Sequence, residues 1–407
     1  MKAIRAFRSV VRFDVPQWNP TERRLSRAAN IDDLRRIAKR RLPGGIFDYY
    51  DGAALDEVTL HRNSASFNDI EYRPRVLRDV SNIDLSTSLF GHEMAMPVML
   101  SPTGFGRIAH SQGELAVARA SRDAGLDYCL STLATRSIED IGAVDGLNKW
   151  FQVYTWRDRD MVKDMVLRAQ HAGYTGLQLT VDTPVFGRRE RDVRRGFTLP
   201  PKIDPRTIVD GILHPSWTLD FLRNDPITFA VVAERKDLNG ETAVTLADYI
   251  NSQFDPALSW DDVAWLRGIW NGALVLKGVQ SVDDALLAID AGVDGIMVSN
   301  HGGRQLDGSP PIIELIEPIS QAVNGRITVI CDGGVRRGGD VFKALALGAD
   351  AVSIGRAYLY GLGAAGERGV TMALNMIRNE LAMTMALVGV TRVSDINRDM
   401  VQWRPTR

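Results

Sequence analysis

The sequence lacks the features of a disulfide-stabilised, metal-cluster or strongly charged nucleic-acid-binding chain. Only two cysteines occur in 407 residues, and both lie in apolar runs, DYCLST at Cys129 and ITVICDG at Cys331. This placement predicts buried, reduced thiols rather than a disulfide or a metal site. The 49 basic and 50 acidic side chains leave a formal net charge of -1. No overall field therefore attracts nucleic acid, and any charge effect must be local.

Long hydrophobic runs are also missing, since none approaches the roughly 20 residues that a membrane-spanning helix needs. The first residues, MKAIRAFRSVVRF, lack the uninterrupted apolar core of a signal peptide. Read as a helix, they place Ile4, Phe7 and Val11 on one side and basic residues on the other, as interfacial helices do. A tail that packs on a neighbouring subunit is the alternative. We expect a cytoplasmic protein, with peripheral contact to the inner face of the cell membrane left open. The basic residues on the polar side of this possible N-terminal helix are Lys2, Arg5, Arg8 and Arg12.

The sequence does contain a repeated alternation of short apolar runs with helical patterns. Segments such as GELAVARASRDAG and SVDDALLAIDAG carry apolar residues at spacings of three and four, and several end in glycine, as helix C-termini prefer. Continuous apolar strands are typical of a parallel sheet covered by helices. Eight such units in about 260 residues predict an α/β fold, a (β/α)8 TIM barrel. The expected strands are 96–102, 127–132, 149–154, 176–182, 273–278, 295–300, 327–333 and 351–356.

Two regions fall outside this repeat. Residues 1–95 are predicted to form an N-terminal extension that packs on the barrel, with a helix from Ile31 to Arg41. The barrel is expected over 96–400, interrupted by a long loop after the fourth strand at about 184–258. A loop of that length in a compact domain is usually a lid, a binding element or a disordered excursion.

The predicted carboxyl ends of the strands are nearly all polar, glycine or charged. In a TIM barrel these ends carry the catalytic groups, whereas core packing alone does not require polar residues there. The pattern therefore predicts an active site at this end of the barrel. The residues are Ser101 to Gly104, Ser131, Gln152, Tyr154, Thr180, Asp182, Lys277, Ser299, His301, Asp332 to Gly334, Gly355 and Arg356.

The last two strand ends, DGGVRRG and IGRA, predict a phosphate site. Both place glycines just before a helix, where backbone N–H groups can approach an anion, and in this fold these loops commonly hold a phosphate. Arg336 and Arg356 would add positive charge, and an ordinary tight turn is the alternative. Lys277 leaves three interpretations open: a Schiff-base nucleophile, a counter-charge to an anionic cofactor, or a solvated rim residue.

The stretch SNHGGRQLDG places His301 close to Arg304, directly after the apolar run GIMVSN. A nearby fixed cation favours the neutral imidazole. A neutral imidazole beside a cation suits a base that acts on an anion.

Together with SNHGGRQLDG, five further segments resemble the FMN-dependent L-2-hydroxy acid oxidising family, which includes glycolate oxidase, flavin L-lactate dehydrogenase and mandelate dehydrogenase. The resemblance covers about Ile31 to residue 400. The long loop with HPSW, and the later segment FDPALSW, are most similar to the membrane-associated, quinone-linked lactate and mandelate dehydrogenases. The five segments are FDYYDGAALDE, SPTGFGRIAH, WFQVYTWRDRD, TVDTPVFGRRERD and DGGVRRGGDVFKALALGADAVSIGRAYLYGL.

The resemblance implies a role for each residue of a substrate site. His301 matches the catalytic base and Asp182 the carboxylate that stabilises its charged form. Arg189 and Arg304 match the arginines that bind the substrate carboxylate. Tyr49 and Tyr154 match the tyrosines whose hydroxyls lie near that carboxylate and the C2 oxygen of the substrate. Tyr50 could take the role of Tyr49 instead.

The resemblance also implies an FMN site, in which Lys277 faces the N1 and O2 edge of the ring and stabilises the charge of the reduced state. Ser131, Gln152, Thr180 and Ser299 match hydrogen-bonding positions at the ring edge. Pro102, Thr103 and Gly104 would supply backbone beside the ring. Asp332, Gly334, Arg336, Gly355 and Arg356 match the ribityl and phosphate site. No metal is implied.

The resemblance implies an enzyme that oxidises an L-2-hydroxy acid to the 2-oxo acid, and L-lactate is the expected substrate. It also implies a homotetramer. A quinone or another non-oxygen acceptor is expected, and an oxidase that reduces O2 to hydrogen peroxide is the nearest alternative. An aldolase or isomerase that uses Lys277, and a noncatalytic flavoprotein, are further alternatives. Two positions depart from the family: Leu133 replaces a bulky aromatic of glycolate oxidase, and Asp51 begins DGAA where the family has SGA.

Overall fold

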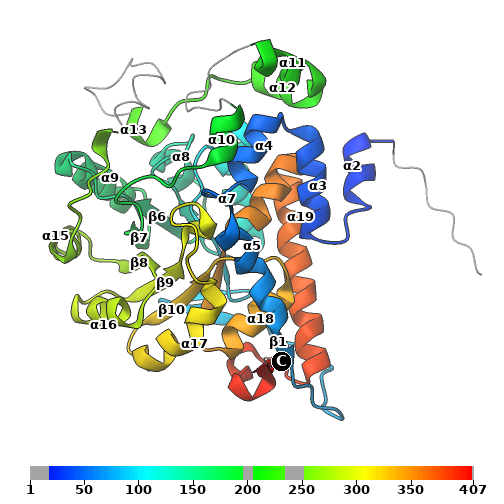
Figure 1. The fold of residues 1–407 in the computed structure, drawn as a ribbon, viewed down its shortest axis with the longest axis vertical. Coiled ribbons are helices and arrows are strands. Elements are labelled where there is room, and N and C mark those ends of the chain that lie inside the picture. The colour runs from blue at the N-terminus through cyan, green and yellow to red at the C-terminus, as the bar shows by residue number, and fades with distance from the viewer. Residues whose placement is uncertain (1–17, 196–204, 234–251, 406–407) are drawn as a thin grey trace, which may run out of the picture.

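A computed structural model describes residues 18–195, 205–233 and 252–405 of the chain. Eight parallel strands form a closed barrel at its centre, in which each strand pairs with the next along the chain and β11 pairs with β4 (Figure 1). The predicted (β/α)8 barrel and all eight of its strands are confirmed. The strands are β4 (Val98–Leu100), β5 (Tyr128–Leu130), β6 (Lys149–Val153), β7 (Gly176–Thr180), β8 (Ala273–Val279), β9 (Gly295–Ser299), β10 (Thr328–Asp332) and β11 (Ala351–Ile354).

The apolar strand residues are buried because helices cover the outer face of the barrel. Every residue of β5, β6, β7 and β9 is buried, which explains why these strands read as continuous rather than alternating apolar runs. Cys129 and Cys331 lie buried and unpaired in β5 and β10, as predicted. The covering helices are α7 (Gly113–Asp123), α8 (Ile138–Gly142), α9 (Arg159–His171), α15 (Trp260–Ile269), α16 (Val282–Asp290), α17 (Ile312–Val323), α18 (Gly338–Ala346) and α19 (Arg356–Val388).

Several helices begin where a short polar side chain accepts a hydrogen bond from a backbone N–H of the first turn. The Ser281 hydroxyl accepts from the N–H of Asp284 at α16, and the Asp158 carboxylate accepts from the N–H of Met161 at α9. Such caps satisfy donors that have no partner within the helix. They set the point at which each loop at the carboxyl end of the barrel turns into a helix.

The N-terminal extension packs along α19. The predicted helix over 31–41 is confirmed as α3 (Ile31–Arg41), which lies beside α19 (Figure 1). The segment around the paired tyrosines forms α4 (Gly44–Asp51). The basic residues proposed for an interfacial helix lie outside the described residues. The remaining elements are α2 (Pro20–Leu25), α5 (Val58–Ala65), α6 (Gly106–Ala109), η1 (Ser66–Asp69), η2 (His301–Gly303), η3 (Val393–Asp395), η4 (Arg398–Met400), the pair β1 (Ile70–Tyr72) with β12 (Val401–Trp403), and the hairpin β2 (Thr87–Leu89) with β3 (His92–Met94).

The long insertion after β7 contains helices in its described parts. They are α10 (Glu190–Arg195), α11 (Pro205–Leu213), α12 (Pro215–Leu222) and α13 (Ala230–Ala233). The indole N–H of Trp217 donates to the carbonyl of Ile108 at 2.7 Å, and Arg41 forms an ion pair with Asp220 at 3.1 Å. These contacts fix α12 to the barrel and to α3, at the end of the molecule where α10 also lies (Figure 1). Among the described helices, none is long and apolar enough to cross a membrane.

Candidate active site

A cavity lies at the carboxyl ends of the strands and is closed on one side by α4 and by the segment before α10. Two predicted site residues stand behind its lining: Asp182 against His301, and Ser299 against Lys277 and Asp332. The structure therefore brings every predicted site residue to one place. Those that line the cavity are Tyr49, Pro102, Thr103, Gly104, Ser131, Gln152, Tyr154, Thr180, Arg189, Lys277, His301, Arg304, Asp332, Gly334, Arg336, Gly355 and Arg356.

His301 is oriented by Asp182. Its Nδ1 lies 3.1 Å from Asp182 Oδ1 and 3.3 Å from Oδ2, so Nε2 is the nitrogen on the opposite side of the ring. The backbone at His301 has a positive φ of 55°, a conformation that side chains other than glycine rarely adopt. The neighbouring Gly303 has a φ of 78°, and a Cβ there would lie 2.7 Å from the backbone nitrogen of Leu60. The glycines after the histidine thus allow a tight turn that directs the imidazole into the cavity.

The predicted carboxylate-binding arginines converge on Tyr49. Cζ of Arg304 lies 5.1 Å and Cζ of Arg189 5.6 Å from the centre of its ring. Nη1 of Arg304 donates to the carbonyls of Tyr49 at 2.6 Å and Gly52 at 2.9 Å. Burial, together with the charge of Arg189, lowers the pKa of Arg304 to about 9. The two guanidinium groups therefore form a site that favours an anion, because a bound carboxylate would relieve their repulsion.

The paired tyrosines have different environments. The hydroxyl of Tyr50 donates to the carbonyl of Phe105, and burial raises the pKa of Tyr50 well above its usual value. The hydroxyl of Tyr49 instead lies next to the backbone of Gly104, since it is 3.7 Å from the position that a Cβ on Gly104 would occupy. Tyr154 is buried, and its burial and the charge of Asp182 raise the pKa of its phenol. Tyr154 therefore stays protonated and able to donate a hydrogen bond at neutral pH.

Lys277 forms a buried ion pair with Asp332. Its Nζ donates to Asp332 Oδ2 and, at 3.0 Å, to the hydroxyl of Ser299. Ser101 and Ser299 also donate to the same carboxylate, at 2.6 Å and 2.7 Å. Burial opposes ionisation of Asp332, but the charge of Lys277 outweighs it and lowers the pKa of the carboxyl. These contacts exclude the solvated rim interpretation of Lys277 and disfavour a Schiff-base nucleophile, which must be neutral to react.

A row of polar side chains crosses the ends of β5, β6 and β7. Gln152 Oε1 accepts from the hydroxyl of Ser131 at 3.2 Å, and its Nε2 donates to the hydroxyl of Thr180 at 3.0 Å. The chain of hydrogen bonds fixes the orientation of the Gln152 amide. It presents donors and acceptors along one side of the cavity, as the edge of a flat heterocycle requires.

The loops after β10 and β11 form the other end of the cavity. Gly334 has a φ of 80°, and a Cβ there would lie 1.9 Å from the carbonyl oxygen of Asn63. A Cβ on Gly355 would meet only Ser101 and Thr103, both at 3.8 Å, so this backbone faces open space in the cavity. Arg336 lies at the same end, with its Cζ 5.9 Å from the ring of Tyr360. Glycine backbone beside an arginine matches the needs of a phosphate group.

Arg356 both lines the cavity and supports its wall. Its guanidinium donates to the carbonyls of Tyr50 at 3.1 Å, Gly302 at 2.9 Å and Gly52 at 2.8 Å. Burial lowers the pKa of Arg356. The sequence indicated its charge but could not indicate these bonds, because they join residues far apart in the chain.

The cavity is also lined by residues that sequence reasoning did not assign, among them Thr183, Phe186, Gln305 and Ser353. The ring of Phe186 lies 4.3 Å from that of Phe254, which in turn lies 5.0 Å from Tyr154. Two signals were available: Gln305 follows Arg304 in SNHGGRQ, and Ser353 lies in the polar end of the last strand. Phe186 lies in TVDTPVFGRRERD, one of the segments that carry the resemblance, but no local pattern indicates that its side chain lines the cavity.

The polar row, the buried ammonium group and the glycine backbone together fit FMN. Lys277 offers a positive charge beside the polar row, and the loops after β10 and β11 offer backbone and charge for a phosphate. These features lie in one cavity with His301, so a substrate bound near His301 would lie next to the cofactor.

Comparison with known proteins gives the same answer. Residues 38–403 match the family of FMN-dependent dehydrogenases. A protein of Mycobacterium tuberculosis provisionally named an L-lactate dehydrogenase is 43% identical over 98% of this chain and 96% of its own. Glycolate oxidase of Spinacia oleracea is 42% identical over 91% of this chain and 95% of its own.

Solved structures agree with this result. The monotopic membrane protein (S)-mandelate dehydrogenase superposes with a TM-score of 0.89 and 37% identity, covering 93% of this chain and 100% of that one. A mandelate oxidase has a TM-score of 0.79 and 39% identity over 92% and 98%. The chain therefore belongs to the FMN-dependent dehydrogenase family, and FMN is its cofactor.

Proposed function

We propose that this FMN-dependent 2-hydroxy acid oxidoreductase acts on a small L-2-hydroxy acid, with L-lactate preferred, and passes the electrons to a quinone or another non-oxygen acceptor. The observation that carries this proposal is the pair His301 and Asp182, which faces the same cavity as Arg189 and Arg304. A base and an anion site in one cavity are what oxidation of a hydroxy carboxylate needs.

The side chains divide the work as follows. Arg189 and Arg304 bind the substrate carboxylate, and Tyr49 and Tyr154 orient it through their hydroxyls. Nε2 of His301 takes up a proton from the hydroxy acid while Asp182 stabilises the resulting imidazolium. FMN, when bound, would supply the acceptor for the two electrons and the second proton that the substrate loses.

The FMN-binding groups keep the assignments that the resemblance implies. Lys277 would stabilise negative charge at the N1 and O2 edge of the bound ring, and its ion pair with Asp332 holds the ammonium group in place. Polar side chains at the strand ends would hold the ring edge, and the loops after β10 and β11 would hold the phosphate. The ring-edge residues are Ser131, Gln152, Thr180 and Ser299, the backbone beside the ring is that of Pro102, Thr103 and Gly104, and the ribityl and phosphate residues are Asp332, Gly334, Arg336, Gly355 and Arg356.

The preference for L-lactate is supported by the relative from Mycobacterium tuberculosis and by the cavity wall. Leu133 and Phe186 line the cavity with apolar surface, which suits a short apolar substituent on C2. Mandelate is the competing substrate, since a mandelate dehydrogenase superposes well on this chain.

Anaerobic mixing of the purified holoprotein with L- and D-2-hydroxy acids tests the reaction. L-Lactate is expected to bleach the flavin absorbance fastest, and D-lactate to leave it unchanged. Reoxidation of the reduced protein by a quinone is expected to exceed reoxidation by air. The proposal fails if no L-2-hydroxy acid bleaches the flavin, and its acceptor is wrong if air is faster.

A peripheral membrane position is proposed because α11 and α12 expose apolar side chains, and Figure 1 shows both helices at the end of the molecule where α10 and α4 lie. Leu213 and Leu222 are each 71% exposed and Ile212 is 70% exposed. An exposed patch of this kind indicates a partner or a membrane surface. A quinone dissolved in the lipid would then lie near the flavin. The full set is Ile208, Val209, Ile212, Leu213, Leu219, Phe221 and Leu222.

Sedimentation with lipid vesicles tests this position. The double variant I212D/L213D is expected to stay in the supernatant while keeping its activity with a soluble dye acceptor. The control is L387D, since Leu387 in α19 is 70% exposed but lies outside α11 and α12. Equal sedimentation of both variants would contradict membrane contact through α11 and α12.

A further inference from the structure

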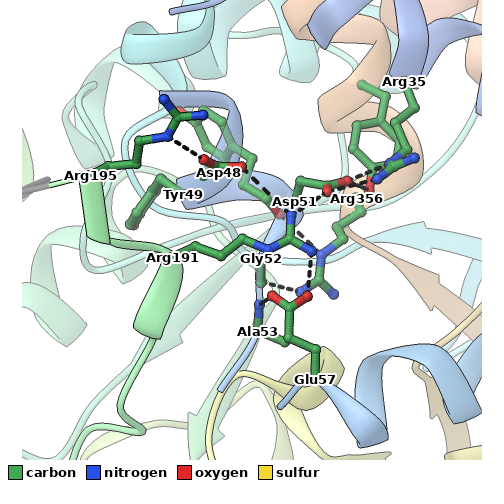
Figure 2. Close-up of polar contacts among 12 residues, drawn as sticks. Arg35, Asp48, Tyr49, Asp51, Gly52, Ala53, Glu57, Arg191, Arg195 and Arg356 are labelled. Carbon is green, nitrogen blue, oxygen red and sulfur yellow. Dashed lines mark hydrogen bonds and ion pairs between the residues drawn. The ribbon is translucent and has the colours of Figure 1, made fainter. Parts of the chain in front are cut away.

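A group of ion pairs outside the cavity ties α10 to α4. At its centre is Asp51, the last residue of α4, which is only 3% exposed. Arg35 of α3 donates to both carboxylate oxygens, at 2.5 Å and 2.8 Å. Arg191 of α10 donates at 2.9 Å and the hydroxyl of Tyr360 in α19 at 2.8 Å. One buried carboxylate therefore joins three helices to α4 (Figure 2).

Arg191 makes a second bond within the same group. Its Nη2 donates to Oε2 of Glu57, whose Oε1 accepts from the backbone N–H of Ala53 at 2.9 Å. Burial alone would lower the pKa of Arg191, but the bonds to Glu57 and Asp51 raise it. The guanidinium is thus held between two carboxylates. Figure 2 shows it pointing from α10 toward the end of α4.

The same stretch of backbone is held from the cavity side. Arg304 donates to the carbonyls of Tyr49 and Gly52, and Arg356 donates to those of Tyr50 and Gly52. Residues 49–52 therefore lie between arginines of the cavity and arginines outside it. A further backbone bond joins the N–H of Leu55 to the carbonyl of Arg188 at 3.0 Å.

This arrangement couples α10 to the anion site. Arg189 directly precedes α10, and its Cζ lies 5.6 Å from the ring of Tyr49. A displacement of α10 away from α4 would move Arg189 away from Tyr49 and Arg304. Loss of Arg191 would also leave the buried Glu57 without its cation, which is costly, whereas Asp51 would keep its bonds to Arg35.

We propose that Asp51, Glu57 and Arg191 position the substrate-binding Arg189 by holding α10 against α4. Asp51 and Arg191 are positioning residues, because neither lines the cavity. The inference rests on the carboxylate-binding role proposed for Arg189. The proposal also assigns a structural role to Asp51, which stands where the resembling family has serine.

The variant R191Q tests the proposal, and R194Q is its matched control. Arg194 belongs to the same helix, but it is 69% exposed and pairs with Glu190 within α10. R191Q is expected to raise KM for the hydroxy acid about 10- to 100-fold, since a misplacement of about 1 Å can cost that much. Its kcat is expected to change by less than about threefold and its FMN content to stay unchanged. R194Q is expected to behave as the unmodified protein.

Two further variants test the partnership. D51N is expected to raise KM similarly, and the effects of D51N and R191Q are expected to be non-additive, because both break the same contact. R191K, which keeps the charge, is expected to recover part of the lost affinity. Additive effects, or an unchanged KM in R191Q, would overturn the proposal.

Hydrogen exchange provides a readout that does not depend on catalysis. In R191Q, exchange is expected to accelerate in peptides covering 48–57 and 188–195 and to stay unchanged in the barrel strands. Acceleration throughout the barrel together with FMN loss would show a general structural role and would overturn the proposal. If no hydroxy acid reduces the unmodified protein, the proposed function fails, and the exchange result still decides whether Arg191 holds α10.

Discussion

Orientation, rather than residue type alone, determines what His301 can do. Its ring is held through Nδ1 by Asp182 and its backbone has a positive φ of 55°. Such a conformation costs on the order of 1 kcal/mol and persists where the surroundings enforce it. Here the N–H of His301 donates to the hydroxyl of Ser299 at 3.1 Å. The same residue that contacts Lys277 thus also fixes the position of the histidine.

Replacement of His301 by glutamine is expected to slow anaerobic flavin bleaching about 10²- to 10⁴-fold, because the base that accepts the proton is lost. FMN is expected to remain bound, since the Lys277 and Gln152 contacts do not involve the histidine. Stopped-flow absorbance measures the rate and the visible spectrum measures the flavin content. The control is H171Q, because His171 is exposed at the end of α9. Bleaching at the unmodified rate would contradict the proposed role.

The lowered pKa of Arg304, about 9, predicts a pH limit on substrate binding. The Arg304 guanidinium loses its proton as pH rises through that pKa. Its attraction for a substrate carboxylate is therefore present below about pH 9 and lost above it. The value of kcat/KM is therefore expected to fall above about pH 9, since it reports groups of the free enzyme.

The variant R189M checks the cause of this limit. Burial is the largest cause of the lowered pKa of Arg304, and the charge of Arg189 is the second largest. Removal of the Arg189 charge is expected to move the alkaline limit to higher pH while raising KM. An unchanged alkaline limit in R189M would show that another group causes it.

Among the elements, the irregular ends of the barrel strands create the site. The pairing of β8 with β9 shifts register between Lys277 and Val279, and the intervening Gly278 has a φ of 117°. A Cβ on Gly278 would lie 2.7 Å from Cβ of Asp182. The bulge and the glycine thus let Lys277 reach Asp332 while Asp182 lies close to the backbone of β8. Bulges beside active sites commonly direct side chains in this way.

The two glycines of the phosphate end are expected to respond differently to substitution by alanine. G334A places a Cβ 1.9 Å from Asn63 O at a φ of 80°, so it is expected to destabilise the fold by about 1–3 kcal/mol or more. G355A has ordinary backbone geometry, with φ near -111°, and is expected to keep the stability of the FMN-free protein but weaken FMN binding. Thermal unfolding and flavin fluorescence titration separate the two effects. Equal stability of both variants would contradict this account.

On the scale of the whole molecule, a nearly neutral chain contains a strongly basic cavity. The net charge of the chain is -1. Among the described residues that line the cavity, however, one acidic residue, Asp332, stands against five basic ones. The basic residues are Arg189, Lys277, Arg304, Arg336 and Arg356. Concentrated like charge disfavours the empty state. Anionic ligands are therefore expected to stabilise the whole barrel, because the cavity joins the ends of strands all around it.

Removal of FMN is expected to lower the melting temperature. A ligand at about 100 times its Kd stabilises a protein by roughly 2.7 kcal/mol, and the relief of repulsion in the cavity adds to this in low salt. Differential scanning fluorimetry of the protein with and without FMN, at low and high ionic strength, measures both effects. A melting temperature that does not depend on FMN would contradict the assignment of the cavity.

The homotetramer is a prediction for the assembled protein. Light scattering of the eluted holoprotein is expected to give four times the chain mass of 45.0 kDa. Deletion of residues 1–17 separates the two alternatives for the basic terminus: a lowered mass would support packing on a neighbouring subunit, and loss of vesicle binding at unchanged mass would support the interfacial helix. A mass of 45.0 kDa for the full chain would contradict the tetramer.

The sequence by itself determined the barrel and many of the polar and charged residues around the cavity. Helical and strand periodicities are local, and parallel strands always bring their carboxyl ends to one side, so Gln152, Lys277 and His301 could be placed together without coordinates. Only the tertiary structure decided that Lys277 is buried against Asp332 and that the Tyr50 hydroxyl is bonded to the Phe105 carbonyl. It also decided that Asp51 bonds Arg191, which lies 140 residues away. These features depend on contacts between distant segments, and no local pattern records such contacts.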